Sequence, residues 1–424
     1  MDGSSQRAPQ APTDTEAAEP AESRVATFAS LKNRNFRWFW LAMVAAFSGL
    51  MMQNLARGWL VYELTSSPFA LGMVSAAWGG PVLLLSIFGG VVTDRVNKRN
   101  LLIVTQVATA VITAVVAVLI LNGAIEVWHL VLAAALTGIT FAFNAPGRQA
   151  MIPELVSGRE LMNALALNSM GVNMTRVGAP AVAGVLVAAI GVAGVYFISV
   201  GLYIVAVAAL FMVTVAPQGR GGSVKSLAAD AAEGLTYIVR RPVIVSLLAV
   251  AFLTVLVGMP YMHMMPAFVV DVLHGGAADL GWLSASGGTG ALAGALVIAS
   301  LGDYRRKGRL MLLIAFGFGL LLVAFALSSN LAFALALIFG IGVTNNGYLV
   351  LNNTLIQSNV PNWVRGRVMS VYSMTFALPF LGALGAGAVA ERLGVATVFW
   401  GSGAMLAVFV LGLAVLHRGL RRLE

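Results

Sequence analysis

The stretch NAPGRQAMIPELVSGR, residues 144–159, returns 208 positions later as NNTLIQSNVPNWVRGR, residues 352–367. At this offset the two stretches share six residues, which are Asn144 and Asn352, Gln149 and Gln357, Pro153 and Pro361, Val156 and Val364, Gly158 and Gly366, and Arg159 and Arg367. Repetition at a fixed offset indicates a duplicated architecture. The two stretches therefore predict a chain built from two related halves.

A second pair of stretches supports the duplication. GGVVTDRVNKR, residues 89–99, corresponds to LGDYRRKGR, residues 301–309, with Asp94 matching Asp303 at an offset of 209. The two pairs lie in different parts of each half and still agree on nearly the same offset. A chance similarity would not be expected to repeat in this way.

The chain around these repeats is too apolar for a water-soluble protein. Of its 424 residues, 59% are hydrophobic and 10% are charged, and the mean hydropathy is +0.88. Polar groups must cover much of a soluble protein, so part of this chain must face lipid. A membrane-spanning helix needs about 20 mainly apolar residues. Such runs occur at 36–62, 70–93, 101–122, 128–147, 162–190, 194–216, 243–268, 279–302, 309–329, 331–356, 367–391 and 395–417.

The runs are continuous rather than alternating, which predicts helices and not barrel strands. We expect an all-α membrane protein with twelve transmembrane helices in two pseudo-symmetric six-helix bundles, 31–216 and 243–417. Six spans preserve sidedness, so the halves are parallel and the substrate path lies between them. Residues 217–242 predict a cytoplasmic linker with an amphipathic helix, either interfacial or ordinary. Residues 1–30 predict a disordered tail and 418–424 a basic one.

The basic residues predict the orientation in the membrane. Of the 26 Lys and Arg residues, all but Arg57, Arg176 and Arg392 fall in the two tails, the central segment or every second turn. Because Lys and Arg accumulate on the cytoplasmic side, we expect a multi-pass protein of the cytoplasmic membrane with both termini in the cytoplasm. The same rule explains the high isoelectric point without a nucleic-acid partner.

The pattern Gly90-x-x-x-Asp94-Arg95-x-x-x-Arg99 resembles the signature between helices 2 and 3 of the major facilitator superfamily. Within that superfamily, RQAMIPELVSGRELMNALALNSM (148–170) and KSLAADAAEGLTYIVRRPVI (225–244) are similar to the branch that contains the enterobactin exporter and related efflux proteins. The resemblance implies a secondary transporter that alternates access by rocking its two halves.

The resemblance also implies a latch. In the superfamily the aspartate that matches Asp94 lies beside the N-terminal end of helix 11 when the cytoplasmic side is closed. Here that helix is expected to begin near 364–367, where Arg365 and Arg367 add positive charge to a helix terminus that already favours a carboxylate. Gly90 permits close approach of two helices, and Arg95 and Arg99 belong to the same turn.

Asp303 and Arg305 form the second copy of this latch, expected to meet the helix that follows Arg159. Its glycine, Gly302, directly precedes the aspartate, which departs from the pattern. The alternative for both turns is a solvated loop that carries the charges of the positive-inside rule.

Arg176 is the first candidate for substrate binding. It lies mid-span, where a charge is costly unless it faces a cavity or a partner. Asn173 and Asn168 lie on roughly the same helix face, and no carboxylate lies near the middle of any run. Arg176 either binds an anionic substrate group or is satisfied by carbonyls, Asn side chains and water.

Six residues of other spans are further candidates for substrate binding, and they are Gln53, Arg57, His263, Tyr261, Asn345 and Asn352. Gln53 and Arg57 share a face of the first span, and Arg57 could pair with Asp271. Asn345 and Asn352 repeat at seven-residue spacing, which predicts a polar stripe that faces the cavity or another helix. His263 and Tyr261 lie between two prolines in the seventh span. A structural His, held by a hydrogen bond, is the simpler interpretation of His263 than a proton carrier.

The leading hypothesis is an exporter of small amphiphilic or anionic molecules, of the siderophore or drug type. Proton antiport follows from the resemblance alone, and we expect a monomer. The alternatives are an uptake or facilitative permease, a lysophospholipid flippase of the same fold, or a polytopic membrane protein that transports nothing. The four His residues are scattered and no HExxH, GxSxG or GxxxxGK[ST] motif occurs, so we expect no enzyme, metal, cofactor or ATP coupling.

Overall fold

The computed structural model describes residues 29–156, 158–214, 236–301, 304–375, 378–421 and 423. Among these residues the regular structure is helical, without a strand, as predicted. Most of the predicted tail, residues 1–28, and of the predicted linker, residues 217–235, lie outside the described residues, as does Asp303. Residues 29 and 30 of that tail belong instead to the 3-10 helix η1 (Ala29–Lys32), and Ser30 donates through its Oγ to the backbone oxygen of Glu160 (2.8 Å).

The first half consists of long helices that begin at polar caps. They are α1 (Arg34–Thr65), α2 (Pro68–Arg95), α3 (Lys98–Leu121), α4 (Val127–Leu155) and α5 (Arg159–Phe211). Asn33 accepts hydrogen bonds from the backbone N–H groups of Asn35 and Phe36, and Ser67 accepts one from Ala70. Such caps satisfy N–H groups that a helix start leaves without partners.

One glycine divides α5 into two spans. Gly191 has φ of 75°, a left-handed conformation that interrupts the 53-residue helix. Gly394, with φ of 84°, separates α13 (Leu378–Leu393) from α14 (Val395–Leu416). Both positions require a residue without a Cβ, so the same turn occurs in each half. Eleven described segments are long and apolar enough to cross a membrane, and the break at Gly191 makes one of them a pair, which gives the predicted twelve spans.

The second half begins with an interrupted span. It comprises α7 (Pro242–Leu253), the π-helix η2 (Thr254–Gly258), the 3-10 turn η3 (Pro260–Met262) and α8 (Met265–Asp271). Pro260 and Pro266 lack the N–H that a continuous helix needs at these positions. The remaining helices are α9 (Ala277–Ser300), α10 (Lys307–Ala326), α11 (Leu331–Asn359), α12 (Asn362–Met374), α13, α14 and α15 (Arg418–Arg421).

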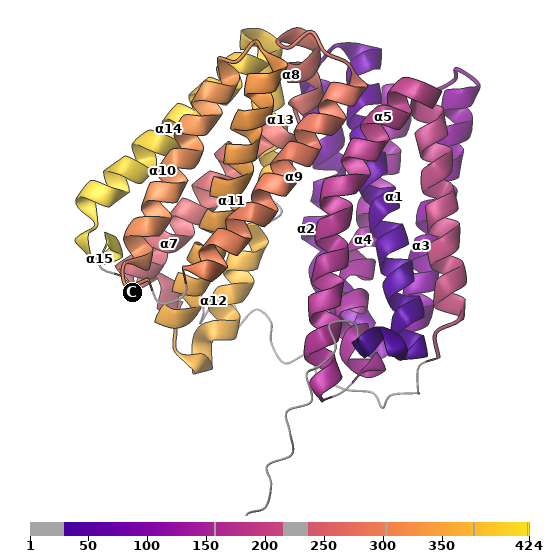
Figure 1. Cartoon of the computed structure of the whole chain (residues 1–424), viewed down its shortest axis with the longest axis horizontal. Coiled ribbons are helices and arrows are strands. Elements are labelled where there is room, and N and C mark those ends of the chain that lie inside the picture. The colour runs from indigo at the N-terminus through magenta and orange to yellow at the C-terminus, as the bar shows by residue number, and fades with distance from the viewer. Residues whose placement is uncertain are drawn as a thin grey trace, which may run out of the picture.

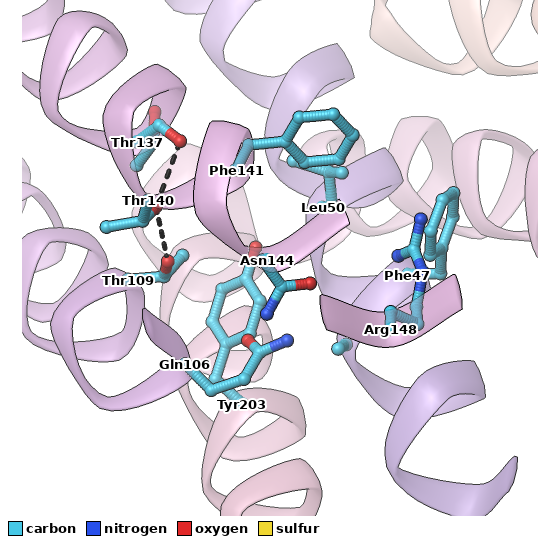
Figure 2. A pocket seen from close by; sticks show the side chains of 11 residues that line it. Phe47, Leu50, Gln106, Thr109, Thr137, Thr140, Phe141, Asn144, Arg148 and Tyr203 are labelled. Carbon is cyan, nitrogen blue, oxygen red and sulfur yellow. Dashed lines mark hydrogen bonds between the residues drawn. The ribbon is translucent and has the colours of Figure 1, made fainter. Parts of the chain in front are cut away.

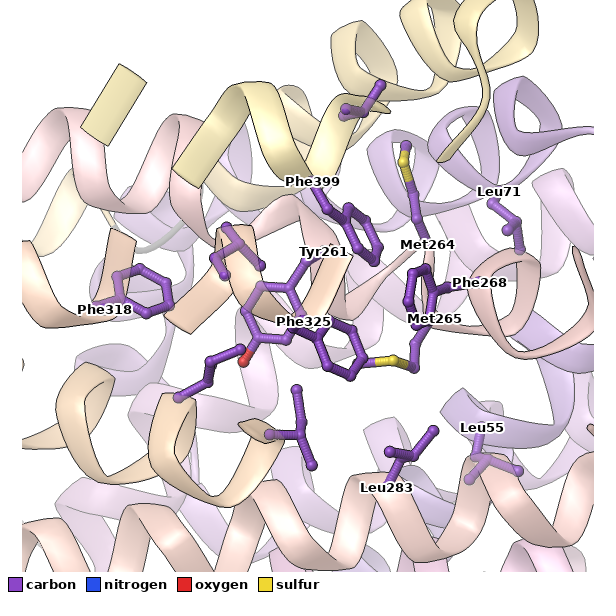
Figure 3. Packing of buried hydrophobic residues seen from close by; sticks show 14 of the residues in the cluster. Leu55, Leu71, Tyr261, Met264, Met265, Phe268, Leu283, Phe318, Phe325 and Phe399 are labelled. Atoms are coloured by element: carbon purple, nitrogen blue, oxygen red, sulfur yellow. The ribbon is translucent and has the colours of Figure 1, made fainter. Parts of the chain in front are cut away.

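Tyr261 belongs to the hydrophobic core of the second half. It is 7% exposed, and its ring packs against Phe318 and Phe399 at centroid distances of 6.4 and 6.3 Å. Figure 3 shows it among buried side chains that include Phe268 and Phe325. The structure thus gives the Tyr261 ring a packing role, and its role in substrate binding stays a prediction.

The two halves meet at one end and separate at the other (Figure 1). We call the end with the turns at 95–98 and 359–362 the basic end, and the end with the turns at 65–68, 271–277 and 393–395 the acidic end. At the acidic end α2 packs on α13, and the first span of α5 packs on α9. At the basic end the ribbons diverge, and α12 stands apart from the first half.

Candidate functional site

Glycines bring the two halves into backbone contact at the acidic end. A Cβ atom at Gly184 of α5 would lie 2.5 Å from the backbone oxygen of Ala277 and 2.7 Å from the Cα of Gly281, both in α9. A Cβ atom at Gly72 of α2 would lie 2.4 Å from the backbone oxygen of Ala383 in α13. These separations are too short for any side chain, so small residues allow the helices to close here.

Hydrogen bonds across the halves add to this closure. Tyr62 at the end of α1 donates its hydroxyl to Oδ2 of Asp271 (2.5 Å). Oε2 of Glu391 accepts from the Ser67 hydroxyl (2.8 Å) and from the backbone N–H of Phe69 (3.1 Å). The second carboxylate thus lies at the N-terminus of α2, where the helix dipole stabilises negative charge.

An aromatic cluster joins the halves deeper in the molecule. The ring of Trp78 in α2 packs against Phe141 of α4 (5.1 Å between centroids) and Phe380 of α13 (4.7 Å). Phe380 in turn contacts the half-buried ring of His263 (4.9 Å). His263 is therefore positioned by aromatic packing at the interface between the halves.

The face of α5 that carries Arg176 changes from open to covered along its length. The residues on this face toward the basic end are exposed or half-buried, and they are Met162, Ala166, Ser169, Asn173 and Arg176. The residues that continue the same face toward the acidic end are buried, and they are Pro180, Ala183 and Val187. Arg176 is the last exposed side chain of this face, one turn before the halves close around it. The backbone oxygen of Arg176 would lie 3.5 Å from a Cβ at Gly288 of α9, which places the arginine beside the seam between the halves.

Asn173 and Asn168 accompany Arg176 on α5 without binding it. Asn173 donates to the backbone oxygen of Ser169 within its own helix (2.9 Å), and Asn168 is half-buried. In the described residues the one ion pair is Lys98 with Glu154. Arg176 therefore has no carboxylate partner among them, which agrees with its sequence pattern.

The predicted pairing of Arg57 with Asp271 is wrong. The guanidinium of Arg57 donates to Oδ1 of Asn54, one turn away on α1 (2.8 Å), and Asp271 accepts instead from Tyr62. The neighbouring residue Gly58 lies against Pro266 of the second half, with 3.3 Å between a built Cβ and Cγ. Arg57 reaches Asn54 within its own helix, whereas a contact with Asp271 would have to cross the interface between the halves.

Gln53 lies inside the first half and not in the space between the halves. It is 2% exposed, donates to Thr113 of α3 (3.2 Å) and accepts from the Tyr203 hydroxyl of α5 (3.1 Å). These hydrogen bonds join three spans of one bundle. Its predicted role in substrate binding is corrected to one in packing, because its amide groups are already engaged.

The asparagines of α11 face the interior of the second half. Asn345 is 9% exposed and Asn352 is fully buried, and neither amide atom of Asn352 has a hydrogen-bond partner among the described residues. On the adjacent face, Asn346 donates to the backbone oxygen of Ala291 in α9 (2.6 Å). Of the two alternatives for this polar stripe, the burial of both side chains favours contact with other helices.

The residues of the first predicted latch turn do not act together in this structure. Gly90 has open space around it, and the glycine in close contact is Gly89, where a Cβ would lie 2.2 Å from the backbone oxygen of Ala142. Asp94 is in the last turn of α2, but its side chain lies outside the described residues, and Arg95 is exposed. Arg99 donates from Nε and Nη2 to the last carbonyls of α5, at 210 and 211 (3.0 and 2.8 Å). It thus caps a helix of its own half.

The opposing basic residues are also engaged locally. Arg365 donates to the backbone oxygen of Val360, at the end of α11, from Nε (3.3 Å) and Nη2 (3.2 Å). Arg367 is half-buried and has an interaction partner, and Arg305 is exposed. The helix α12, which contains Arg365 and Arg367, begins earlier than expected, at Asn362, because Pro361 occupies its N-cap.

Sequence reasoning missed Arg148, which it had placed in a turn. The helix α4 continues through Pro146 and Pro153 to Leu155, so Arg148 lies within it. Its guanidinium carbon lies 4.5 Å from the centroid of the Phe47 ring of α1. Trp78 was missed as well, although a tryptophan followed by Gly79 inside a span is a signal for close helix contact.

Comparisons with known proteins agree with this architecture. The family described as transmembrane secretion effector, of the major facilitator superfamily, matches residues 25–423. The chain is 25% identical over 370 residues to the multidrug efflux pump Tap of Mycolicibacterium fortuitum, covering 84% of this chain and 90% of Tap. It is 27% identical over 366 residues to the enterobactin exporter EntS of Shigella boydii, covering 83% of this chain and 85% of EntS.

Solved structures share the fold. A bacterial homologue of the human lysosomal transporter Spinster, in an inward-facing and occupied conformation, superposes with a TM-score of 0.72. The match covers 91% of this chain and 97% of the other at 15% identity. At that identity the likeness shows the fold alone, which is the predicted arrangement of two six-helix bundles.

Proposed function

We propose that this chain, which belongs to the transmembrane secretion effector family of the major facilitator superfamily, exports small amphiphilic or anionic molecules of the siderophore or drug type. One observation carries this proposal. Arg176 is the last exposed residue on its face of α5 before the halves pack together, and it has no carboxylate partner among the described residues. A cation within a membrane span that has no fixed counter-ion attracts an anionic group.

The second support is the closure of one end and the separation of the other. The hydrogen bonds of Asp271 and Glu391 and the contact of Gly184 with α9 all lie at the acidic end. In the proposed cycle these contacts break when the halves rock, and the latch of Asp94 with the start of α12 forms at the basic end. We place the basic end and both termini in the cytoplasm, since Lys and Arg accumulate there.

Export is proposed because the matched relatives are named as an efflux pump and an exporter. Exchange for protons is proposed from the superfamily pattern around Asp94, since a polytopic chain without a nucleotide-binding loop needs an ion gradient to concentrate a substrate. Both statements concern the direction and the energy of transport, and one assay tests them together.

The test is dye movement in proteoliposomes that contain the full chain, with and without an imposed pH gradient. Carboxyfluorescein serves as the anionic probe and ethidium as the cationic probe. We expect the gradient to drive carboxyfluorescein, and Arg176→Gln to reduce that movement at least about tenfold, the effect of losing a charge-assisted contact. Arg392→Gln, an exposed arginine at the acidic end, is the matched control.

Each other outcome contradicts a defined part of the proposal. Movement that ignores the gradient indicates a facilitative permease. Movement of ethidium alone, or an unchanged rate in Arg176→Gln, removes Arg176 from the substrate site. If no probe or candidate moves under any gradient, the proposal of proton-coupled export is wrong.

A further inference from the structure

A small pocket lined by both apolar and polar side chains lies inside the first half, between α1, α3, α4 and the second span of α5 (Figure 2). Its volume is about 30 Å³, room for roughly two water-sized groups. The half-buried residues Phe47, Leu50, Phe141 and Arg148 come from α1 and α4 and form its mouth. Phe141 contacts the Trp78 that packs on the second half, so the mouth lies on the side of the interface between the halves.

The deep wall of the pocket is buried and polar. Thr109 and Thr140 share a hydrogen bond (2.9 Å), and Asn144 donates from Nδ2 to Thr105 (2.9 Å). Gln106 is 6% exposed and lines the pocket, and it has no hydrogen-bond partner among the described residues. The amide of Gln106 is open to the pocket and not enclosed by other groups, so it can donate to and accept from a molecule bound there.

Arg148 places a positive charge at the mouth. Its guanidinium stacks on Phe47, which is 13 residues and therefore about 20 Å from the start of α1 at the basic end. A lysine or arginine that merely extends to the membrane surface would point away from such a depth. The side chain of Arg148 is instead held inside the bundle by the aromatic ring.

No carboxylate of the described residues neutralises this charge. Glu154, the carboxylate of the same helix, pairs with Lys98, and this is the one ion pair of the described residues. A cation–π contact contributes about 0.5–2 kcal/mol, which does not replace a counter-ion for a charge inside a membrane. At the repeat offset of 208, Arg148 corresponds to Ile356, so the second half has no equivalent charge.

We infer that this pocket is a second anion subsite, in which Arg148 and Gln106 bind a carboxylate end-group of the transported molecule. The two oxygens of a carboxylate match a volume of about two water-sized groups, and a guanidinium and an amide N–H are the donors that a carboxylate prefers. The body of such a molecule does not fit the pocket and lies in the space between the halves, toward Arg176. The inference rests on the proposed function, because it names the substrate class of that export.

The test is equilibrium binding to the purified full chain in nanodiscs, with carboxyfluorescein polarisation as the readout. Citrate and its uncharged trimethyl ester serve as matched competitors. We expect citrate to displace the probe and the ester to fail. We expect Arg148→Gln and Gln106→Leu each to weaken citrate binding, Arg148→Gln by at least about tenfold, and Arg392→Gln to change nothing. Gln106→Leu keeps the test valid if Arg148→Gln does not fold.

The outcomes separate this inference from the proposed function. If Arg148→Gln and Gln106→Leu bind citrate as the native chain does, or if the ester competes equally, the subsite is overturned even when proteoliposomes export carboxyfluorescein. A native chain that does not bind citrate overturns it as well. If both variants lose citrate binding but the native chain moves no anion, the subsite stands and the export proposal fails.

Discussion

The acidic end and the basic end of the molecule are held together in different ways. At the acidic end the halves contact one another through backbone, as Gly184 does against Gly281, and through the carboxylates of Asp271 and Glu391. At the basic end the charged side chains bond within their own half, as Arg99 does to the end of α5 and Arg365 to the end of α11. Arg99 and Arg365, which the predicted latch requires, thus cap helices in this state.

The contacts at the two ends differ in the free energy that is needed to break them. A glycine seam is a fixed geometry that either fits or clashes. A cap by arginine is one of several hydrogen bonds available to a flexible side chain. We therefore expect substitutions at the acidic end to shift the conformational balance far more than those at the basic end.

The opening of the acidic end can be measured with a single cysteine reporter. The chain contains no cysteine, so a single Leu71→Cys can be labelled with a bulky, water-soluble maleimide. Leu71 is 2% exposed, precedes Gly72 of the closed seam, and belongs to the same buried cluster as Met264 of the second half (Figure 3). Its labelling rate measures how often the acidic end opens, because a buried thiol reacts only from an opened state.

The largest effect is expected from Gly184→Leu. Its new side chain would have to occupy the 2.5 Å between the built Cβ and the backbone of α9, and backbone cannot move aside as a flexible side chain can. Overpacking costs about 1–3 kcal/mol, and each 1.4 kcal/mol is tenfold in an equilibrium, so labelling of Leu71→Cys should rise about tenfold or more.

The matched control is Gly201→Leu, since Gly201 lies on the same long helix with nothing within 4 Å of a built Cβ. Its labelling rate should equal that of the unsubstituted reporter. Equal rates in Gly184→Leu and Gly201→Leu would show that the seam does not hold the acidic end closed.

Much of this arrangement could be predicted from the sequence, and the remainder shows what sequence cannot supply. Apolar runs and the repeat of Asp94 and Asp303 suffice for twelve spans in two halves, because span length and duplication are properties of the chain alone. The direction of a polar side chain within a span depends on its neighbours in space. Gln53 and Asn352 therefore carried no mark that they face inward.

Arg148 and Arg176 show how far the sequence predicts that an arginine lies within a membrane-spanning helix. Arg176 was recognisable because nothing in its run ends the helix. Arg148 follows Pro146 and precedes Pro153, and such prolines usually mark the end of a helix. In a membrane bundle, neighbouring helices and Thr or Ser side chains stabilise a helix that continues through proline, and α4 does so.

A smaller effect is expected from Glu391→Gln. The amide keeps the shape of the side chain but removes the charge that accepts from Ser67 and from the N-terminus of α2. A charge at a helix terminus contributes about 0.3–1 kcal/mol, so the labelling rate should rise about two- to fivefold. Arg392→Gln on the next residue is the control, and a rate no higher than in this control would exclude Glu391 from the closure.

The effect of Tyr62→Phe should be smaller again. The substitution removes one hydroxyl, which donates to Asp271 at 2.5 Å, and preserves the ring. Net contributions of single hydrogen bonds are about 0.5–1.5 kcal/mol, and part of this is recovered because Asp271 is exposed and regains water. We expect about a twofold rise in labelling. A rise as large as that of Gly184→Leu would contradict the view that packing dominates the acidic end.

The smallest change in labelling is expected from Asp94→Asn, and it has the opposite sign. In the proposed latch Asp94 stabilises the state in which the basic end is closed and the acidic end is open, so its loss favours the state described here. Labelling of Leu71→Cys should stay level or fall, while carboxyfluorescein export in proteoliposomes should decrease strongly, since one half of the cycle is lost. Combining Asp94→Asn with Glu391→Gln, which destabilises the other state, should restore part of the export. Rescue of this kind requires that the two ends compete, whereas a solvated loop at Asp94 predicts no change in either measurement.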